Sequence, residues 1–220
     1  MDIQKLMQLT KTERDNLKNT SDNEDNPIYA KLDPVKPFVG NQKIKLIIVG
    51  QDPTIRNFSS RKNINISLNL DKPNSIHRYI SNEICGNIGI DLQNIYATNL
   101  FKYFYVCPPS DTFHVLQQHL KTNVKILLTE LRHFKGVPII TLGEPVLKLL
   151  TNSKSKMQYY WDYDRSKKAS NLNFKYCKGA ETILNTEFFP FPHQPSYSRN
   201  EFYKNTFIHY LNYFKKLNNF

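Results

Sequence analysis

Four polar residues with chemically useful side chains each follow a short apolar segment of the chain. They are Gln51, Asp52, Asn99 and His193. A carboxylate can accept a proton, an amide offers a donor beside an acceptor, and a neutral imidazole can do either. If the apolar segments are neighbouring parallel strands, their carboxyl ends meet at the crevice where open α/β sheets bind ligands. We therefore expect these side chains to surround one ligand.

Asp52 lies in the segment Gly50-Gln51-Asp52-Pro53. Gly50 lets the chain turn sharply away from the preceding strand, while Pro53 fixes one backbone angle and removes a donor. The pattern indicates a stiff loop that displays a carboxylate at the edge of the sheet. The alternative is an ordinary turn, because Asp and Pro are both common turn residues. This segment alone favours neither interpretation.

The apolar segments predict an α/β fold in which a mostly parallel, four-stranded central sheet lies between layers of helices. Short runs rich in β-branched residues and bounded by glycine or polar residues are typical of buried strands. The strands are expected at 43–50, 94–100, 137–143 and 187–191. Apolar residues at helical spacing predict helices at 1–20, 112–134, 144–150 and 200–217, and a further helix that begins near Pro73.

The segment 63–71, NINISLNLD, leaves two possibilities open. Its apolar residues alternate with polar ones and fall on one face, which is typical of a strand. The other possibility is an extended loop.

Charge divides the chain into two parts. Residues 1–26 hold four basic and six acidic side chains and form a predicted N-terminal helical extension, broken at 21–27, that could bind a protein partner. Residues 27–220 form one predicted domain and carry a net charge of +13, within the +11 of the whole chain. Such a balance favours a polyanionic partner, with nucleic acid the first candidate. Solvated surface lysines are the alternative explanation of the same charge.

Composition disfavours several functional classes. The three cysteines, Cys85, Cys107 and Cys177, form no C-x-x-C pair and are too few for a four-thiolate zinc or iron–sulfur site. Their number and spacing predict a reducing compartment, and the polar N-terminus lacks a signal peptide's apolar core, so we expect a cytoplasmic protein. No apolar run approaches the roughly 20 residues of a membrane span. The absence of a glycine-rich phosphate loop disfavours a nucleotide enzyme, and we expect neither metal nor cofactor.

Several segments resemble, in their order along the chain, the motifs of the uracil-DNA glycosylase superfamily. Residues 50–53 resemble the family's water-activating loop, and 97–100 (ATNL) resemble the strand end whose Asn reads the base. Residues 193–198 (HQPSYS) resemble the loop that carries the catalytic His and a DNA-probing side chain, and 141–146 resemble a strand-to-helix junction of the family. The matches span about 44–214. The resemblance implies the family's three-layer α/β/α sandwich.

The resemblance also implies a monofunctional DNA glycosylase of base excision repair, which flips uracil out of DNA and hydrolyses its N-glycosidic bond without a cofactor. Asp52 takes the place of the carboxylate that orients water and stabilises the sugar cation, and His193 that of the donor to the departing base. Asn99 and Gln51 take base-binding places. The amide of Asn99 suits the O4 and N3 edge of uracil, whereas cytosine reverses that pattern.

The family's DNA contacts are implied for residues of the same segments. Tyr197 stands where a side chain enters the space left by the flipped nucleotide, and a ring there could stack between bases. A surface tyrosine, in a chain with 13 of them, is the alternative. Phosphate contacts are implied for Ser67, Ser196, Ser198 and Arg199.

Three positions depart from the most familiar branch of the family. Thr54 stands where a Tyr blocks the methyl group of thymine, Ile66 stands where an aromatic ring stacks on uracil, and Gln194 replaces the Pro after the His. Thr54 and Ile66 are thus expected to bind the base, and they keep two alternatives open. One is a glycosylase for hypoxanthine or mismatched thymine. The other is a glycosylase-like module that binds DNA or protein without catalysis.

Overall fold

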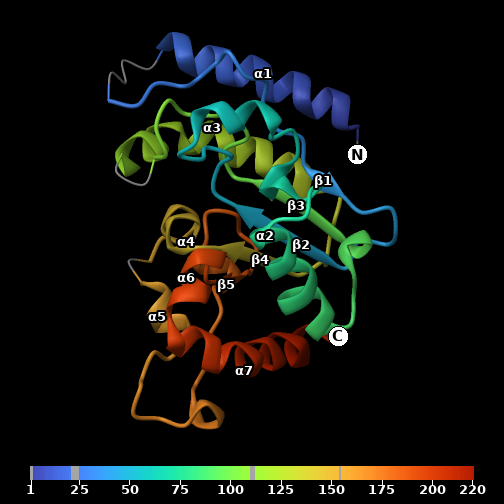
Figure 1. Ribbon diagram of the computed structural model, residues 1–220, viewed down its shortest axis with the longest axis vertical. Coiled ribbons are helices and arrows are strands. Elements are labelled where there is room, and N and C mark those ends of the chain that lie inside the picture. The colour runs from blue at the N-terminus through green and yellow to red at the C-terminus, as the bar shows by residue number, and fades with distance from the viewer. Residues whose placement is uncertain (1, 21–24, 110–111, 154) are drawn as a thin grey trace.

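The computed structural model describes residues 2–20, 25–109, 112–153 and 155–220. Its centre is a five-stranded sheet with the order β1-β3-β2-β4-β5 (Figure 1). The strands are β1 (Phe38–Val39), β2 (Leu46–Gly50), β3 (Ile95–Asn99), β4 (Ile139–Leu142) and β5 (Phe189–Phe191). β3, β2, β4 and β5 run parallel, as expected, and the short β1 pairs antiparallel with β3. Sequence reasoning missed β1 because two residues are too few to show an alternating pattern.

Helices cover both faces of the sheet, so the expected α/β/α sandwich is confirmed. In Figure 1, α3 lies on one side of the sheet with α1 outside it, and α7 lies on the opposite side. The helices are α1 (Ile3–Thr20), α2 (Ser75–Arg78), α3 (Phe113–Leu131), α4 (Glu144–Leu150), α5 (Met157–Tyr160), α6 (Gln194–Arg199) and α7 (Glu201–Asn218). A π-helical segment, Tyr79–Gly86, continues α2. None of the helices in these described ranges has both the length and the apolar character needed to cross a membrane.

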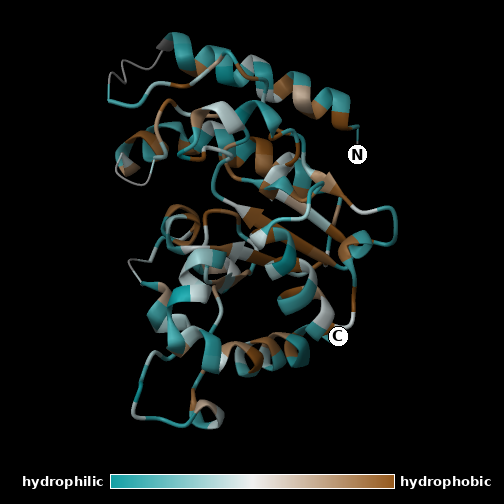
Figure 2. Ribbon diagram, viewed as in Figure 1, coloured by the Kyte–Doolittle hydropathy of each residue, from teal (hydrophilic) through white to brown (hydrophobic). Residues whose placement is uncertain are grey.

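The long helices of the body each bury one apolar stripe. Leu116, Val124 and Leu127 of α3 are buried, and Phe207 and Phe214 are buried on α7. Apolar residues that recur every three to four positions lie on one face of a helix, and that face packs against the sheet. Figure 2 shows the result, with apolar strands in the centre and polar residues on the outer faces of the helices.

The register of the sheet brings the carboxyl ends of its parallel strands to one edge. Gly50 of β2 lies opposite Asn99 of β3, and Val49 lies opposite Thr141 of β4. The loops that follow these strands therefore start side by side. This edge is where the polar residues singled out by the sequence must meet if they form a site.

α1 confirms the helix expected at 1–20 and docks on the body next to α3. Leu6 and Arg14 are buried there, and Arg14 Nη1 donates to the carbonyl of Leu32 at 2.9 Å. A buried arginine was not part of the expected apolar stripe, and its hydrogen bond fastens the helix to the chain that follows. Of the expected break at 21–27, residues 21–24 lie outside the described residues.

The segment 63–71 forms no strand, so its strand interpretation is wrong and a loop is the nearer description. The chain there contains two 3-10 turns, Phe58–Asn63 and Ser67–Asn69. Leu68 and Asn69 have φ angles of 58° and 50°, in the left-handed region, which interrupts any extended strand. The apolar alternation instead lets Leu68 and Leu70 pack onto the core from an irregular loop.

Candidate active site

A cleft of about 530 Å³ opens at the carboxyl ends of the parallel strands. Asp52, from the loop after β2, and His193, from the loop after β5, both line it. Much of the remaining wall is apolar and includes Pro53, Ile64 and Leu68. The fold thus brings the carboxylate and the imidazole from distant parts of the sequence to one cavity.

The carboxylate of Asp52 is held by its neighbours in the loop. The backbone N–H of Thr54 donates to Oδ1 at 2.7 Å, and Gln51 Nε2 donates to Oδ2 at 2.9 Å. Burial raises the pKa of Asp52 to about 6, although the hydrogen bonds from Thr54 and Gln51 oppose this rise. A carboxylate with such a pKa is ionised near neutrality and is a better proton acceptor than an exposed aspartate.

Arg61, which sequence reasoning missed, braces the loop that carries Asp52. Its buried guanidinium donates from Nε to the carbonyl of Ile55 at 2.7 Å, and from Nη1 to the carbonyls of Tyr105 and Val106 at 2.8 Å each. Its positive charge also lowers the pKa of Asp52, against the larger effect of burial. One arginine in a polar loop gives no sequence signal of this role, because the carbonyls it binds include two from a distant segment.

Asn99 ends β3 with a buried amide whose Oδ1 and Nδ2 have no hydrogen-bond partner among the described residues. A buried polar group left unpaired costs about 1–3 kcal/mol, so such an amide is suited to a ligand that pairs with it. A Cβ added at Gly50, the partner of Asn99 across the ladder, would lie 2.8 Å from Asn99 Oδ1. Glycine at position 50 therefore leaves room for this amide as well as for the turn.

A buried ion pair lies behind Asn99 and holds its backbone. Lys102 Nζ donates to the carbonyl of Asn99 at 2.9 Å and forms an ion pair with Glu130 of α3. The hydroxyl of Tyr96 donates to the same carboxylate. The side chains of Lys102 and Glu130 are 1% and 0% exposed, so both charges depend on each other for stabilisation. Sequence reasoning missed this network, because the lysine lies in an aromatic stretch and the glutamate on a distant helix.

His193 directly precedes α6, at the mouth of the cleft. The residue is exposed overall, yet the surrounding protein removes part of the water around its imidazole and so lowers the pKa of His193. The imidazole is therefore neutral near pH 7 and has a hydrogen to donate. Its loop is anchored by the buried hydroxyl of Tyr79, which donates to the carbonyl of Pro192 at 2.8 Å. Gly143, before α4, packs closely against the Cβ of His193.

None of the residues expected to bind the base or the phosphates lines the cleft. Gln51 donates to Asp52, and the buried amide of Asn99 lies near Leu68 of the cleft wall. Thr54 is half-buried, and its Oγ1 accepts a hydrogen bond from the backbone N–H of Tyr105 at 2.9 Å. Ile66 is half-buried and forms an isolated parallel bridge with Lys36. Ser67 is fully buried, so a phosphate could reach its hydroxyl only after a rearrangement. Their functional roles remain predictions.

The short helix α6 carries the other expected DNA contacts on its surface. Ser196, Ser198 and Arg199 are exposed. Tyr197 is half-buried, however, and its ring packs against Tyr79 and Phe207, with centroids 5.0 and 4.8 Å away. The insertion of Tyr197 into DNA stays a prediction, and it requires the ring to leave this aromatic cluster.

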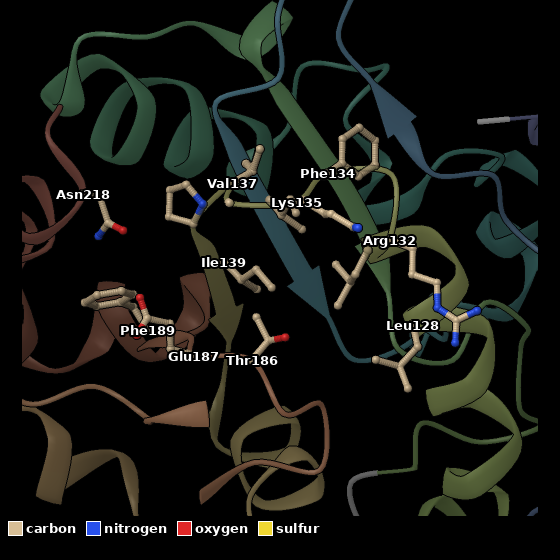
Figure 3. Close-up of a pocket in the computed structure, with 14 residues that line it drawn as sticks. Leu128, Arg132, Phe134, Lys135, Val137, Ile139, Thr186, Glu187, Phe189 and Asn218 are labelled. Carbon is tan, nitrogen blue, oxygen red and sulfur yellow. The ribbon is translucent and has the colours of Figure 1, made fainter. Parts of the chain in front are cut away.

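A second cavity, of about 370 Å³, lies at the amino ends of the strands and thus at the opposite edge of the sheet. Figure 3 shows its lining side chains, which include Val137 and Ile139 at the start of β4 and Phe189 at the start of β5. Arg132 and Lys135 add positive charge to its rim. This cavity is remote from Asp52, His193 and Asn99, and we assign the chemistry to the cleft.

Asp52 and His193 at the cleft, together with Asn99 near Leu68 of its wall, suit the hydrolysis of a bond whose cleavage creates opposite charges. Asp52 can bind water and face a developing cation, the neutral His193 can donate to a developing anion, and the free amide of Asn99 can bind a planar polar edge. In the described part of the chain, no three His, Cys, Asp or Glu residues are grouped to hold a metal ion.

The chain matches the model of a known protein family. Residues 37–217 match the family model described as Uracil DNA glycosylase superfamily. No curated protein matches the chain. The matched range contains Asp52, Asn99 and His193, together with every strand of the sheet, and it leaves α1 outside.

Proposed function

This chain belongs to the uracil DNA glycosylase superfamily, and on that premise we propose that it removes uracil from DNA by hydrolysing the N-glycosidic bond. Membership of this family supports a glycosylase-type function in DNA repair, with DNA as the substrate. Our proposal adds two points. The base removed is uracil, and the reaction is hydrolysis alone, which leaves an abasic site in an uncut strand. It is supported chiefly by one observation: Asp52 and His193 line one cleft, and the unpaired amide of Asn99 lies near Leu68 of the cleft wall.

In this mechanism, breaking the bond between the base and C1′ leaves positive charge on the deoxyribose and negative charge on the uracil. Asp52 faces the cation and accepts a proton from the attacking water, whose oxygen forms the new bond to C1′. His193 stabilises the departing anion by donating a hydrogen bond to its O2, as a preorganised donor at developing charge does. The base leaves with the bonding electron pair, and solvent later protonates it.

Selection of the base rests on Asn99. Its Nδ2 can donate to the O4 of uracil, and its Oδ1 can accept from N3–H. Cytosine presents a donor in place of O4 and an acceptor in place of N3–H, so both groups of Asn99 would face like partners. Such a mismatch in a buried site discriminates strongly between substrates.

We expect the rate of excision to fall as the pH drops through about 6, because water activation needs the ionised carboxylate and burial raises the pKa of Asp52 to about 6. Well below that value the loss approaches about tenfold per pH unit. The pKa of His193 is lowered from its ordinary value of 6.5, so its protonation adds no fall near neutrality. Single-turnover rates on a uracil oligonucleotide across pH would measure this profile. A rate that stays constant from about pH 8 to pH 5 would contradict the role of Asp52.

We expect Gly143→Ala to slow excision by about tenfold through displacement of His193. A Cβ at Gly143 would lie 3.3 Å from His193 Cβ, and the φ of +95° there disfavours any other residue. Gly136→Ala is the matched control, because Gly136 also has a positive φ, +77°, with open space around it. Both substitutions place a side chain at a positive φ, which strains the backbone by about 1–3 kcal/mol. Equal excision rates in the two folded variants would show that contact with Gly143 does not place the imidazole.

The proposed activity is tested with single- and double-stranded oligonucleotides that contain one uracil, at low salt. Hydrolysis without strand cleavage predicts abasic sites that break only after treatment with alkali. A thymine oligonucleotide of the same sequence is the control. Failure to form abasic sites on either uracil substrate would refute the proposal. DNA binding without excision of any damaged base would instead favour a binding module.

A second candidate is a glycosylase for another base, such as hypoxanthine or thymine mispaired with guanine. It is favoured by Thr54, whose side chain is bound to the backbone of Tyr105 rather than placed in the cleft. Without a bulky ring at this position, the methyl group of thymine meets less obstruction. A panel of duplexes that carry these bases separates the two candidates by their relative rates.

We further propose a reducing, cytoplasmic location and a protein partner for the N-terminal helix. Cys85, Cys107 and Cys177 are free thiols, which supports the first proposal. The outer face of α1 exposes Leu9 beside polar residues, which supports the second. Fractionation of cells tests the location, and Leu9→Asp in a pull-down tests the partner.

A further inference from the structure

Leu68 is next to both the cleft and the amide of Asn99. Its side chain lines the cleft, whereas that of Asn99 does not. Leu68 Cδ2 and Asn99 Oδ1 lie 2.5 and 2.8 Å from the point where Gly50 would carry a Cβ. Because Gly50 has no side chain, a methyl group of Leu68 fills that place, beside the amide that would read the base.

Unpaired polar atoms accumulate around this leucine. Both amide atoms of Asn99, Oγ of Ser67 and Oδ1 of Asn69 are buried and lack a hydrogen-bond partner among the described residues. A methyl group cannot pair with any of them. Buried polar groups are almost always paired in folded proteins, so this cluster indicates a place that a polar ligand completes.

The backbone around Leu68 is held firmly in an unfavourable conformation. Leu68 has φ 58° and ψ 12°, a left-handed geometry that non-glycine residues rarely adopt. Ser67 N–H donates to the carbonyl of Lys36 at 2.7 Å, and Asn74 Nδ2 donates to the carbonyl of Asn69 at 2.7 Å. With anchors on both sides, the backbone stays in place while the half-buried side chain of Leu68 is free to change rotamer.

We propose that Leu68 is the cover of the base pocket: its side chain occupies the pocket in the free protein and swings aside when a nucleobase pairs with Asn99. The inference rests on the proposed function and deepens it. The base that fits is one whose polar edge completes the unpaired groups and whose ring fits the space that one leucine side chain vacates. Leu68 therefore sets both the fraction of molecules whose pocket is open and the size of the base that the pocket accepts.

A covered pocket lowers the apparent affinity for any base, because only the fraction of molecules with the cover displaced can bind. Removing the cover therefore strengthens base binding. If Leu68 were instead a wall on which the base rests, removing it would weaken binding through lost contact. The two possibilities therefore predict opposite changes in the apparent Kd for a base when the side chain of Leu68 is removed.

The experiment titrates the intact protein and its variants with free uracil, thymine and hypoxanthine, followed by NMR signals of the Asn side-chain amides. We expect Leu68→Gly to lower the apparent Kd for uracil about tenfold and to shift an amide signal that Asn99→Ala removes. Glycine suits the left-handed φ at this position, so the variant is expected to fold, and thermal unfolding checks this. Leu68→Met, which keeps a cover of similar volume, is expected to bind as the parent does.

Ile64→Ala is the matched control, because Ile64 lines the same cleft and is half-buried but is not among the atoms next to Gly50. We expect it to leave uracil binding unchanged or to weaken it. Weaker or unchanged binding of every base to folded Leu68→Gly would overturn the inference. If the parent protein excises no uracil, the proposed function fails, yet tighter binding of any other base to Leu68→Gly still supports the cover.

In excision assays, the cover predicts a shift in substrate range. We expect Leu68→Gly to raise the ratio of hypoxanthine to uracil kcat/KM at least about fivefold, since the larger ring gains most from the added space. An unchanged ratio in a variant that retains uracil excision would refute the role of Leu68 in size selection.

Discussion

Asp52→Asn is expected to slow base excision by about 10³-fold while leaving the affinity for DNA nearly unchanged. The substituted amide keeps the shape of the side chain, but it can neither accept the proton of the attacking water nor stabilise a cation by charge. Single-turnover excision and a binding titration on the same duplex measure the two quantities. Asp71→Asn is the control, because Asp71 is an exposed carboxylate in the neighbouring loop.

The same substitution should stabilise the folded protein at alkaline pH. Burial raises the pKa of Asp52 from 3.8 to about 6, so the fold favours the protonated form, and ionisation above pH 6 destabilises it. Asn has no charge to bury, so the gain is largest near pH 8, at most about 3 kcal/mol, and disappears below about pH 4. Urea unfolding of the parent and the variant, near pH 8 and below about pH 4, measures this gain in the free energy of unfolding. Full activity of the variant, or a stability loss at pH 8, would contradict our account of this carboxylate.

Lys102→Met is expected to reduce the free energy of unfolding by about 3–5 kcal/mol, because it leaves the buried carboxylate of Glu130 without its counter-charge. It also removes the hydrogen bond to the carbonyl of Asn99. The pair of exposed Lys148 and half-buried Glu144, 3.6 Å apart, provides the control, since Lys148→Met should cost less than about 1 kcal/mol. Urea unfolding near pH 7 compares the two variants.

A second substitution separates lost charge pairing from lost packing. If the cost of Lys102→Met arises from the unpaired carboxylate, then adding Glu130→Gln should recover a large part of the lost stability. Any remaining loss of uracil selectivity in the double variant would then reflect the position of Asn99 alone. Equal instability of the single and double variants would show that the ion pair itself stabilises little.

The parts of the fold that could be predicted are those in which local pattern and tertiary packing agree. The expected helix 144–150 matches α4 in both bounds, because glycine, an N-terminal proline and an apolar stripe all indicate the same helix. The segment 63–71 was misread because Leu68 and Asn69 adopt left-handed angles that only surrounding contacts can enforce. Side-chain alternation carries no information about such angles.

The residues of the candidate site likewise fall into those that the sequence predicted and those that it did not. Asp52 and His193 follow apolar strands, so the topology of a parallel sheet was enough to predict that they share a cleft. Arg61 and Lys102 were missed because their partners are backbone carbonyls and a buried carboxylate, which leave no motif in the sequence. The expected insertion of Tyr197 into DNA stays a prediction; in the structure its ring lies against other rings, a packing preference that any tyrosine has.

The pairing of Gly50 with Asn99 across adjacent strands limits how this protein can acquire new substrates. Hydrogen-bonded strands are about 4.8 Å apart, so the loop with the proposed water-activating carboxylate of Asp52 and the amide of Asn99, proposed to read the base, are fixed to one rigid frame. A change in either strand disturbs both the chemistry and the recognition. Mutations in the irregular segment 63–71 alter recognition alone, and evolution toward other lesions is therefore expected to proceed there.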